Sequence, residues 1–203
     1  MAARSSGLDA VARYLDSLPA GVASHPECQM KGAVIRAYFD SLPAISAPPE
    51  LPAEAIALLE QPPAPSAWVP EVVCHVLMLL AAHDLFETED AYLDHVLRTN
   101  RGLFESLTYR VLFSLVRPKT TLAQASARWG LFHAGTTLEP VGKIRRGSGD
   151  LVLRAPPDHC PLVLAKGYAA SFRAVVEAAG ASGAEVEVEL RNPGEVLFRA
   201  RWR

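Results

Sequence analysis

The strongest constraint on the fold is a change in hydrophobic period after Gly135. Before this glycine, apolar residues recur at the three- and four-residue spacing of amphipathic helices. After it, several segments alternate apolar and polar side chains, as half-buried strands do. We therefore predict an α+β fold with a helical N-terminal two-thirds. A C-terminal antiparallel sheet with one packed helix follows, in the order β-β-(β)-α-β-β.

Apolar stripes and helix-ending residues divide the N-terminal part into helices. The segment 69–85 is apolar nearly all round, which predicts a buried central helix. Thr88 is a suitable N-cap for the next helix, which we expect Gly102 to interrupt. The other predicted helices cover residues 7–18, 26–42, 53–60, 103–116 and about 120–132.

The C-terminal part alternates over several short segments joined by turn residues. Predicted strands cover 136–141, 150–154, 160–164, 184–190 and 196–202, with a helix over 167–179. The basic segment 142–149 is expected to form a hairpin turn that could contact an anion. Three glutamates (185, 187 and 189) alternate on one strand and three arginines (199, 201 and 203) on the next, which suits cross-strand ion pairs. This face is either a solvated sheet surface or a polar docking surface.

Proline marks the expected organisation of the chain. Residues 43–70 contain eight of the sixteen prolines, which predicts a semi-rigid connector with a short helix inside it. Residues 1–42 then form an N-terminal helical hairpin, and residues 71–203 form the α+β core domain. We expect the hairpin and the core to pack as one unit.

Charge is strongly segregated, although the net charge is only −2. Residues 37–97 hold ten acidic groups and no lysine or arginine, whereas residues 98–146 hold nine basic and two acidic groups. The two blocks either pack against each other or form separate faces that orient a partner. The basic residues predicted to contact a partner protein, a second copy or an anion are Arg98, Arg101, Arg110, Arg117, Lys119, Lys143, Arg145 and Arg146. The overall balance argues against a dedicated nucleic-acid binder.

Other classes of protein are disfavoured by what the sequence lacks. The longest apolar run, residues 76–82, is too short to span a bilayer, and residues 1–30 do not have the form of a signal peptide. The three cysteines (Cys28, Cys74 and Cys160) are widely spaced, which favours reduced thiols and a cytoplasmic location.

Reactive residue types are present without a recognised catalytic or metal-binding spacing. His25 and Cys28, Cys74 and His75, and His159 and Cys160 are close pairs, but no set of four ligands has the spacing of a zinc site. The sequence therefore predicts no metal site, and it identifies no catalytic residue. An unrecognised enzyme would require Asp158, His159 and Cys160 to converge in one cleft. The aromatic residues, Trp129 among them, are expected either in the core or lining an apolar pocket.

Several C-terminal segments resemble a family of uncharacterised myxobacterial paralogues. The resemblance rests on Trp129, Phe132-His-Ala-Gly-Thr-Thr137, Pro156-Pro157, Gly167-Tyr168, Ala179-Gly180-Ala181 and Phe198-Arg-Ala-Arg-Trp202. That family is similar in layout to the haem-NO-binding, vinyl-reductase-type and TRAPP superfamily, whose members bind small ligands or partner proteins. Several haem proteins hold iron through a histidine on a helix, and His95 is the candidate for that role here, although the resemblance itself assigns no functional residue. The Tyr-x-Ser-x-Arg motif of the haem-binding branch is absent.

The sequence therefore favours a non-enzymatic, cytoplasmic protein- or ligand-binding module, in signalling or regulation, with no cofactor. The first alternative is a small-molecule or haem sensor of the haem-NO-binding type, with His95 as the haem ligand and an apolar small ligand as another occupant. The second alternative is an unrecognised enzyme.

Overall fold

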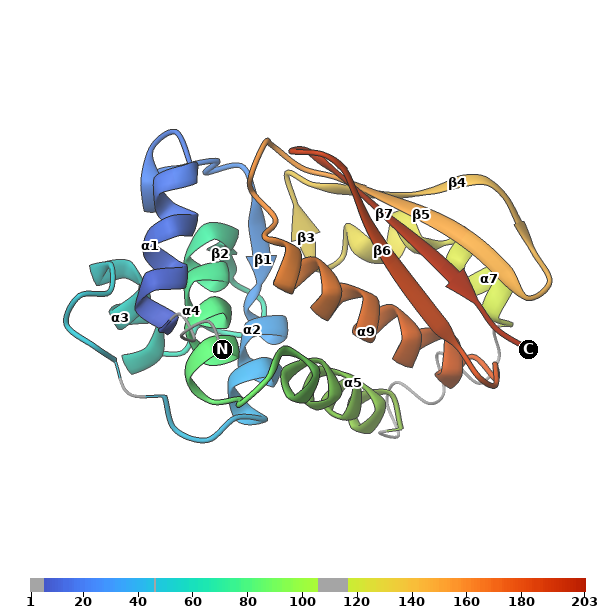
Figure 1. Ribbon diagram of the computed structural model, residues 1–203, viewed down its shortest axis with the longest axis horizontal. Coiled ribbons are helices and arrows are strands. Elements are labelled where there is room, and N and C mark those ends of the chain that lie inside the picture. The colour runs from blue at the N-terminus through green and yellow to red at the C-terminus, as the bar shows by residue number, and fades with distance from the viewer. Residues whose placement is uncertain (1–5, 46, 106–116) are drawn as a thin grey trace.

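The computed structural model describes residues 6–45, 47–105 and 117–203. Figure 1 shows the helices that precede residue 85 at one end of the molecule and the larger, four-stranded sheet at the other. The N-terminal helices are α1 (Gly7–Ser17), α2 (Gly32–Asp40), α3 (Ala53–Glu60), α4 (Glu71–Asp84) and α5 (Glu89–Glu105), with a short 3-10 helix over Gly21–Ala23. The described helices include none that is both long and apolar enough to cross a membrane.

The C-terminal part confirms the predicted α+β class. Its helices are α7 (Pro118–Ala123), α8 (Ala125–Trp129) and α9 (Leu162–Ala178). Its strands are β4 (Thr137–Arg145), β5 (Ser148–Arg154), β6 (Glu185–Asn192) and β7 (Glu195–Arg201), antiparallel in the order β4-β5-β7-β6. Helix α9 lies along this sheet, and α5 lies beside α9 (Figure 1).

A second, smaller sheet joins distant segments of the chain. Its strands are β1 (Gln29–Lys31), β2 (Trp68–Pro70) and β3 (His133–Ala134), antiparallel in the order β2-β1-β3. Strand β2 leads directly into α4, and β3 is followed by β4 through Gly135. Gly135 has a left-handed φ of 74°, and a Cβ there would lie 2.5 Å from the Glu27 carbonyl oxygen. Glycine is required because the chain passes so close to Glu27.

The buried apolar residues of the described chain form two large clusters, one at each end, and a small third cluster of Ala82, Tyr92 and Val96. Helix α4 is surrounded by apolar side chains from α1, α2, α3 and β1, as its all-round apolar sequence predicts. The other large cluster fills the space between α9 and the larger sheet, where Ala165, Ala169 and Val176 face Leu151 and Phe198. The predicted division of the chain at residues 42 and 70 stays a prediction.

Several predicted helix boundaries are wrong. Residues 26–42 are not one helix, because β1 occupies part of this segment and α2 begins only at Gly32. Gly102 does not interrupt its helix, since α5 continues to Glu105. The predicted helix over about 120–132 is divided into α7 and α8, and the strand β3 begins at His133. Most of the predicted helix over 103–116 lies outside the described residues.

Two predictions in the C-terminal part are also wrong. The predicted strand over 160–164 is instead the start of α9, which begins at Leu162 with Pro161 as its N-cap residue. Proline suits the start of a helix because an amide hydrogen at that position has no partner within the helix, so its absence costs nothing. The expected turn over 142–149 is shorter, because β4 extends to Arg145 and β5 begins at Ser148.

The charged hairpin forms, but Arg203 lies beyond the end of β7 and does not belong to the strand. Glu185 pairs with Arg201 and Glu187 with Arg199 in the β6–β7 register, and Arg199 makes an ion pair with Glu189. These side chains alternate with Val186 and Val188, which pack toward the core. Because the pairs are largely exposed, they set the register of the strands more than they stabilise the fold.

Replacing Phe198 by alanine tests the packing of α9 on the sheet. Phe198 is fully buried, and its ring packs edge-on against Phe172 with 4.9 Å between centroids. We expect Phe198→Ala to lower the free energy of unfolding by about 3–5 kcal/mol. Leu190→Ala is the control, because Leu190 is 48% exposed and its loss should change stability by about 0.5 kcal/mol or less. Urea denaturation measures both, and equal effects would contradict this packing.

Candidate functional site

A buried carboxylate stands at the junction between the two ends of the molecule. Glu71 is the first residue of α4 and is 1% exposed. Its amide donates a hydrogen bond to the Cys28 carbonyl oxygen, which fixes the start of the helix beside β1. A negative charge is favoured at this position by the helix dipole, but burial requires further partners.

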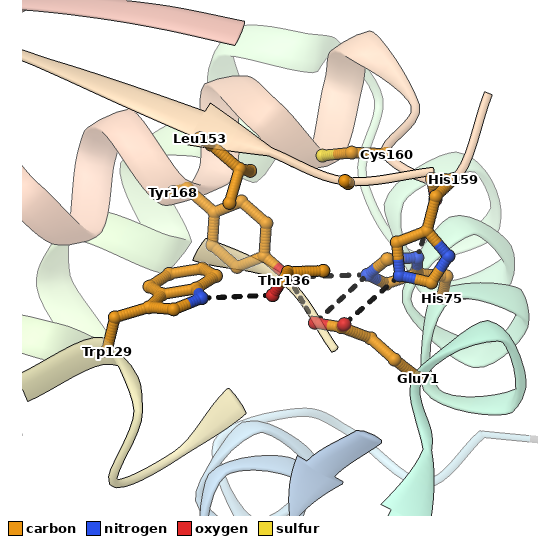
Figure 2. A pocket seen from close by; sticks show the side chains of 9 residues that line it. Glu71, His75, Trp129, Thr136, Leu153, His159, Cys160 and Tyr168 are labelled. Atoms are coloured by element: carbon orange, nitrogen blue, oxygen red, sulfur yellow. Dashed lines mark hydrogen bonds and ion pairs between the residues drawn. The ribbon is translucent and has the colours of Figure 1, made fainter. Parts of the chain in front are cut away.

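Three side chains from distant segments contact this carboxylate, and Figure 2 shows two of them, His159 and Tyr168. His133 Nδ1 lies 2.7 Å from Oε1, and His159 Nε2 lies 3.1 Å from Oε2. The Tyr168 hydroxyl donates to Oε1 over 3.3 Å. Together with His75, these residues form what we call the Glu71 cluster: Glu71, His75, His133, His159 and Tyr168.

His75 lies one turn after Glu71 on the same face of α4. Its Nε2 is 3.8 Å from Glu71 Oε1 and 3.3 Å from the Tyr168 hydroxyl. Its Nδ1 is 3.1 Å from both the Tyr14 hydroxyl and the His159 carbonyl oxygen. Tyr14 donates its own proton to that carbonyl over 2.9 Å. Because the carbonyl can only accept, this arrangement assigns the imidazole hydrogen to Nδ1 and leaves a lone pair on Nε2.

The electrostatics of the cluster follow from burial and hydrogen bonding. Burial alone would raise the pKa of Glu71, but the hydrogen bonds with His133 and His159 outweigh it and hold this pKa well below its ordinary value. Burial lowers the pKa of His75 to about 3, so this imidazole is neutral at pH 7. Burial also raises the pKa of the nearby Cys160 thiol. The Glu71 cluster therefore contains an ionised carboxylate beside a neutral imidazole, and the neighbouring Cys160 thiol is protonated.

Local structure holds the histidines in place. Strand β3 carries His133, whose ring stacks on Trp129 with 3.7 Å between centroids and 6° between planes. Trp129 is fixed in turn by a hydrogen bond from Nε1 to the Thr136 hydroxyl, 3.0 Å long. His159 follows Asp158, whose left-handed φ of 59° turns the chain just before α9.

A small pocket adjoins the cluster (Figure 2). Its lining combines cluster members with neighbouring side chains: Glu71, His75, Trp129, Thr136, Leu153, Ala155, His159, Cys160 and Tyr168. The space is at most about 170 Å³. Drug-sized ligands occupy pockets of roughly 300–1,000 Å³. The side chains leave no room here for a water molecule, so the space suits a bare ion, or a small polar ligand only after side chains move, and it is not the larger apolar pocket that the sequence left open.

The predicted site residues lie apart from this cluster. His95 is half-buried on α5, and its Nε2 is 3.1 Å from the Ser41 hydroxyl. Arg101 makes two hydrogen bonds to the Glu177 carboxylate, 2.7 and 2.9 Å long, so α9 neutralises it. Arg110 lies outside the described residues. The exposed remainder lie on α5, at the start of α7 and on the β4–β5 hairpin: Arg98, Arg117, Lys119, Lys143, Arg145 and Arg146. Their contact with a partner or an anion stays a prediction.

The candidate enzyme residues are brought together only in part. His159 and Cys160 line the pocket, whereas Asp158 is exposed. Glu71 was not among the predicted site residues, although one signal was present. It is a charged residue at the start of an otherwise apolar helix, and His75 follows it at the four-residue spacing that places both on one face.

Replacing Tyr14 by phenylalanine tests the hydrogen bonding around His75. The change removes a buried hydroxyl that contacts His75 Nδ1 and the His159 carbonyl oxygen. We expect the free energy of unfolding to fall by about 1.5 kcal/mol. Ser17→Ala is the control on the same helix. Because Ser17 is exposed, this change should alter the free energy of unfolding by about 0.5 kcal/mol or less. An unchanged Tm for Tyr14→Phe would contradict this role.

Comparison with known proteins identifies the fold. No protein-family model matches the chain, and no curated protein matches its sequence. Among solved structures, the Fe(II) unliganded H-NOX protein from K. algicida matches with a TM-score of 0.56 and 14% identity, over 86% of this chain and 97% of that one. A point mutant of the same K. algicida protein matches with a TM-score of 0.54 and 13% identity, over the same shares.

A third solved structure gives the same result. It comes from work on modulating haem redox potential through protein-induced porphyrin distortion, and it matches with a TM-score of 0.54 and 9% identity, over 85% of this chain and 99% of that one. At these identities the matches concern the fold alone. The chain has the fold of H-NOX proteins, and its resemblance to the haem-NO-binding superfamily is confirmed at that level.

Proposed function

We propose that this chain is a sensor module that binds a small polar or ionic ligand at the Glu71 cluster. The observation that carries the proposal is an ionised carboxylate, 1% exposed, contacted by side chains from three distant segments in an H-NOX fold. A buried charge of this kind is costly unless it is fully paired, and such groups are concentrated at functional sites.

The position of the cluster also supports a sensor role. Glu71 and His75 belong to α4, His133 to β3 and Tyr168 to α9, so a ligand here would contact both ends of the molecule. A ligand can shift a conformational equilibrium only through contacts that differ between the two states. A ligand at the junction would contact elements of both ends and would therefore favour one relative arrangement of them.

The residues around His95 do not fit a haem, although the similar solved structures are haem or iron proteins by their descriptions. His95 Nε2 contacts the hydroxyls of Ser41, at 3.1 Å, and Thr99, at 3.4 Å. The Phe86 ring lies 5.0 Å from the imidazole, between centroids. The pocket at the Glu71 cluster is also far too small for a porphyrin ring.

A haemin titration tests this difference from the similar solved structures. We expect the purified chain to show no Soret band beyond that of free haemin. The reason is that His95 Nε2 contacts two hydroxyl groups and does not face an open pocket. Absorption spectroscopy measures the band, with an H-NOX protein treated in parallel as the positive control. A stable Soret band that is lost in His95→Ala would support the haem sensor and contradict the proposed site.

Native mass spectrometry tests whether the cluster holds a ligand. We expect protein purified without chelators to carry an added small mass, and we expect Glu71→Gln to lose it because the carboxylate charge is gone. His95→Ala is the matched control and should keep the added mass. A wild-type chain with no added mass would contradict the proposal. The cytoplasmic location and any partner protein or homodimer stay predictions.

A further inference from the structure

We infer that the ligand of the Glu71 cluster is a divalent transition-metal ion, held by Glu71, His75 and His159. This inference rests on the proposed function, since it names the occupant of the same site. The three residues are fully buried, and one ligand atom from each lies within 4.8 Å of the other two. Figure 2 shows the carboxylate facing both imidazoles.

The separations between these atoms suit one ion. The carboxylate of Glu71 is 3.8 Å from His75 Nε2 and 3.1 Å from His159 Nε2. Zn²⁺ binds nitrogen and carboxylate oxygen at about 2.0–2.2 Å, so tetrahedral ligand atoms lie about 3.4 Å apart. The observed distances fall on either side of this value, and small side-chain rotations would equalise them.

The hydrogen bonds around His75 match those of a metal-binding histidine. A ligating imidazole usually donates its other ring hydrogen to a carbonyl or carboxylate, which fixes the tautomer. His75 does so through Nδ1, toward the His159 carbonyl oxygen at 3.1 Å, and its Nε2 lone pair faces Glu71. The carboxylate is itself held by His133 Nδ1 at 2.7 Å. His133 therefore acts as a positioning residue for Glu71.

Electron-rich atoms that face each other in the site indicate a cation. The His75 lone pair and the carboxylate face each other across 3.8 Å, and two electron-rich groups in a buried space repel each other unless a proton or a cation lies between them. The Tyr168 hydroxyl lies 3.3 Å from both, but it has only one proton to offer. A bound ion would replace the hydrogen that lies between His159 Nε2 and the carboxylate, and Nδ1, which is buried without a hydrogen-bond partner within the described residues, would then carry the ring hydrogen.

The ligand set indicates the chemical class of the ion. Two imidazoles with one carboxylate are typical of Zn²⁺ and Fe²⁺ sites that keep a further coordination position open. The Tyr168 hydroxyl, 3.3 Å from both His75 Nε2 and Glu71 Oε1, lies beside the place of the ion. A site of this kind would bind a small exogenous ligand at the ion, as a sensor requires.

Metal binding by the full-length chain tests the inference, with Zn²⁺ as the probe. Because the site is buried, Zn²⁺ is supplied both to the native protein and during refolding from urea. We expect one Zn²⁺ per chain by elemental analysis, and a higher Tm for the zinc-bound protein. The Co²⁺-loaded chain should show visible absorption from nitrogen and oxygen ligands in a four- or five-coordinate site.

Variants locate the ion. His75→Ala and His159→Asn each remove one ligand, and we expect each to weaken Zn²⁺ binding by at least the roughly 10–100-fold that loss of an outer hydrogen-bond partner costs. His95→Ala removes a histidine outside the cluster and should bind Zn²⁺ as the wild type does. Circular dichroism without metal checks that each variant is folded. If a variant is unfolded, Zn²⁺ uptake by the wild type still tests whether the chain binds the ion.

The outcomes separate the inference from the proposed function. If the wild type takes up no Zn²⁺ by either route, or if both ligand variants bind it as tightly as the wild type, the metal inference is wrong. If the chain then still carries a non-metal mass that Glu71→Gln loses, the proposed function stands without the metal. A chain with neither metal nor other ligand contradicts both.

Discussion

The ionised carboxylate of Glu71 is the interaction on which the arrangement of this molecule depends. An isolated carboxylate in a protein interior is prohibitively costly, so its partners must be present whenever the chain is folded. Those partners come from β3, from the segment before α9 and from α9 itself, which are 62 to 97 residues away in the sequence. Satisfying one charge therefore fixes the relative positions of the helical end and the sheet end.

Much of the fold could be predicted because its signals are local. The alternation of Glu185, Val186, Glu187 and Val188 identifies β6 without reference to the rest of the chain, and β7 follows for the same reason. The all-round apolar sequence of α4 likewise predicts its burial. The small sheet could not be predicted, because its strands have only two or three residues and are stabilised by pairing with distant segments. The same limit explains why residues 26–42 were wrongly predicted as one helix.

The site was harder to predict than the fold, since its residues have no regular spacing. His75 and His159 were each considered beside a cysteine neighbour in the sequence, whereas their actual partner is a glutamate on α4. Only the pair Glu71 and His75 has a local signal, because a four-residue spacing on a helix places both on one face. His133 and His159 reach the carboxylate through long-range packing, which no spacing rule describes. The many basic residues of 98–146 suggested a binding surface, but one of them, Arg101, instead forms an ion pair with Glu177.

The small sheet has a consequence for how the two ends of the molecule can move. Strand β1 pairs with β2, which leads into Glu71, and with β3, which carries His133. Glu71 and His133 are thus connected twice, once directly through their side chains and once through the main chain of β1, which pairs with both β2 and β3. Any change in the separation of Glu71 and His133 must also shift hydrogen bonds of Met30 or its neighbours. The site and this three-stranded sheet therefore form one mechanical unit, in which movement at either is transmitted to the other.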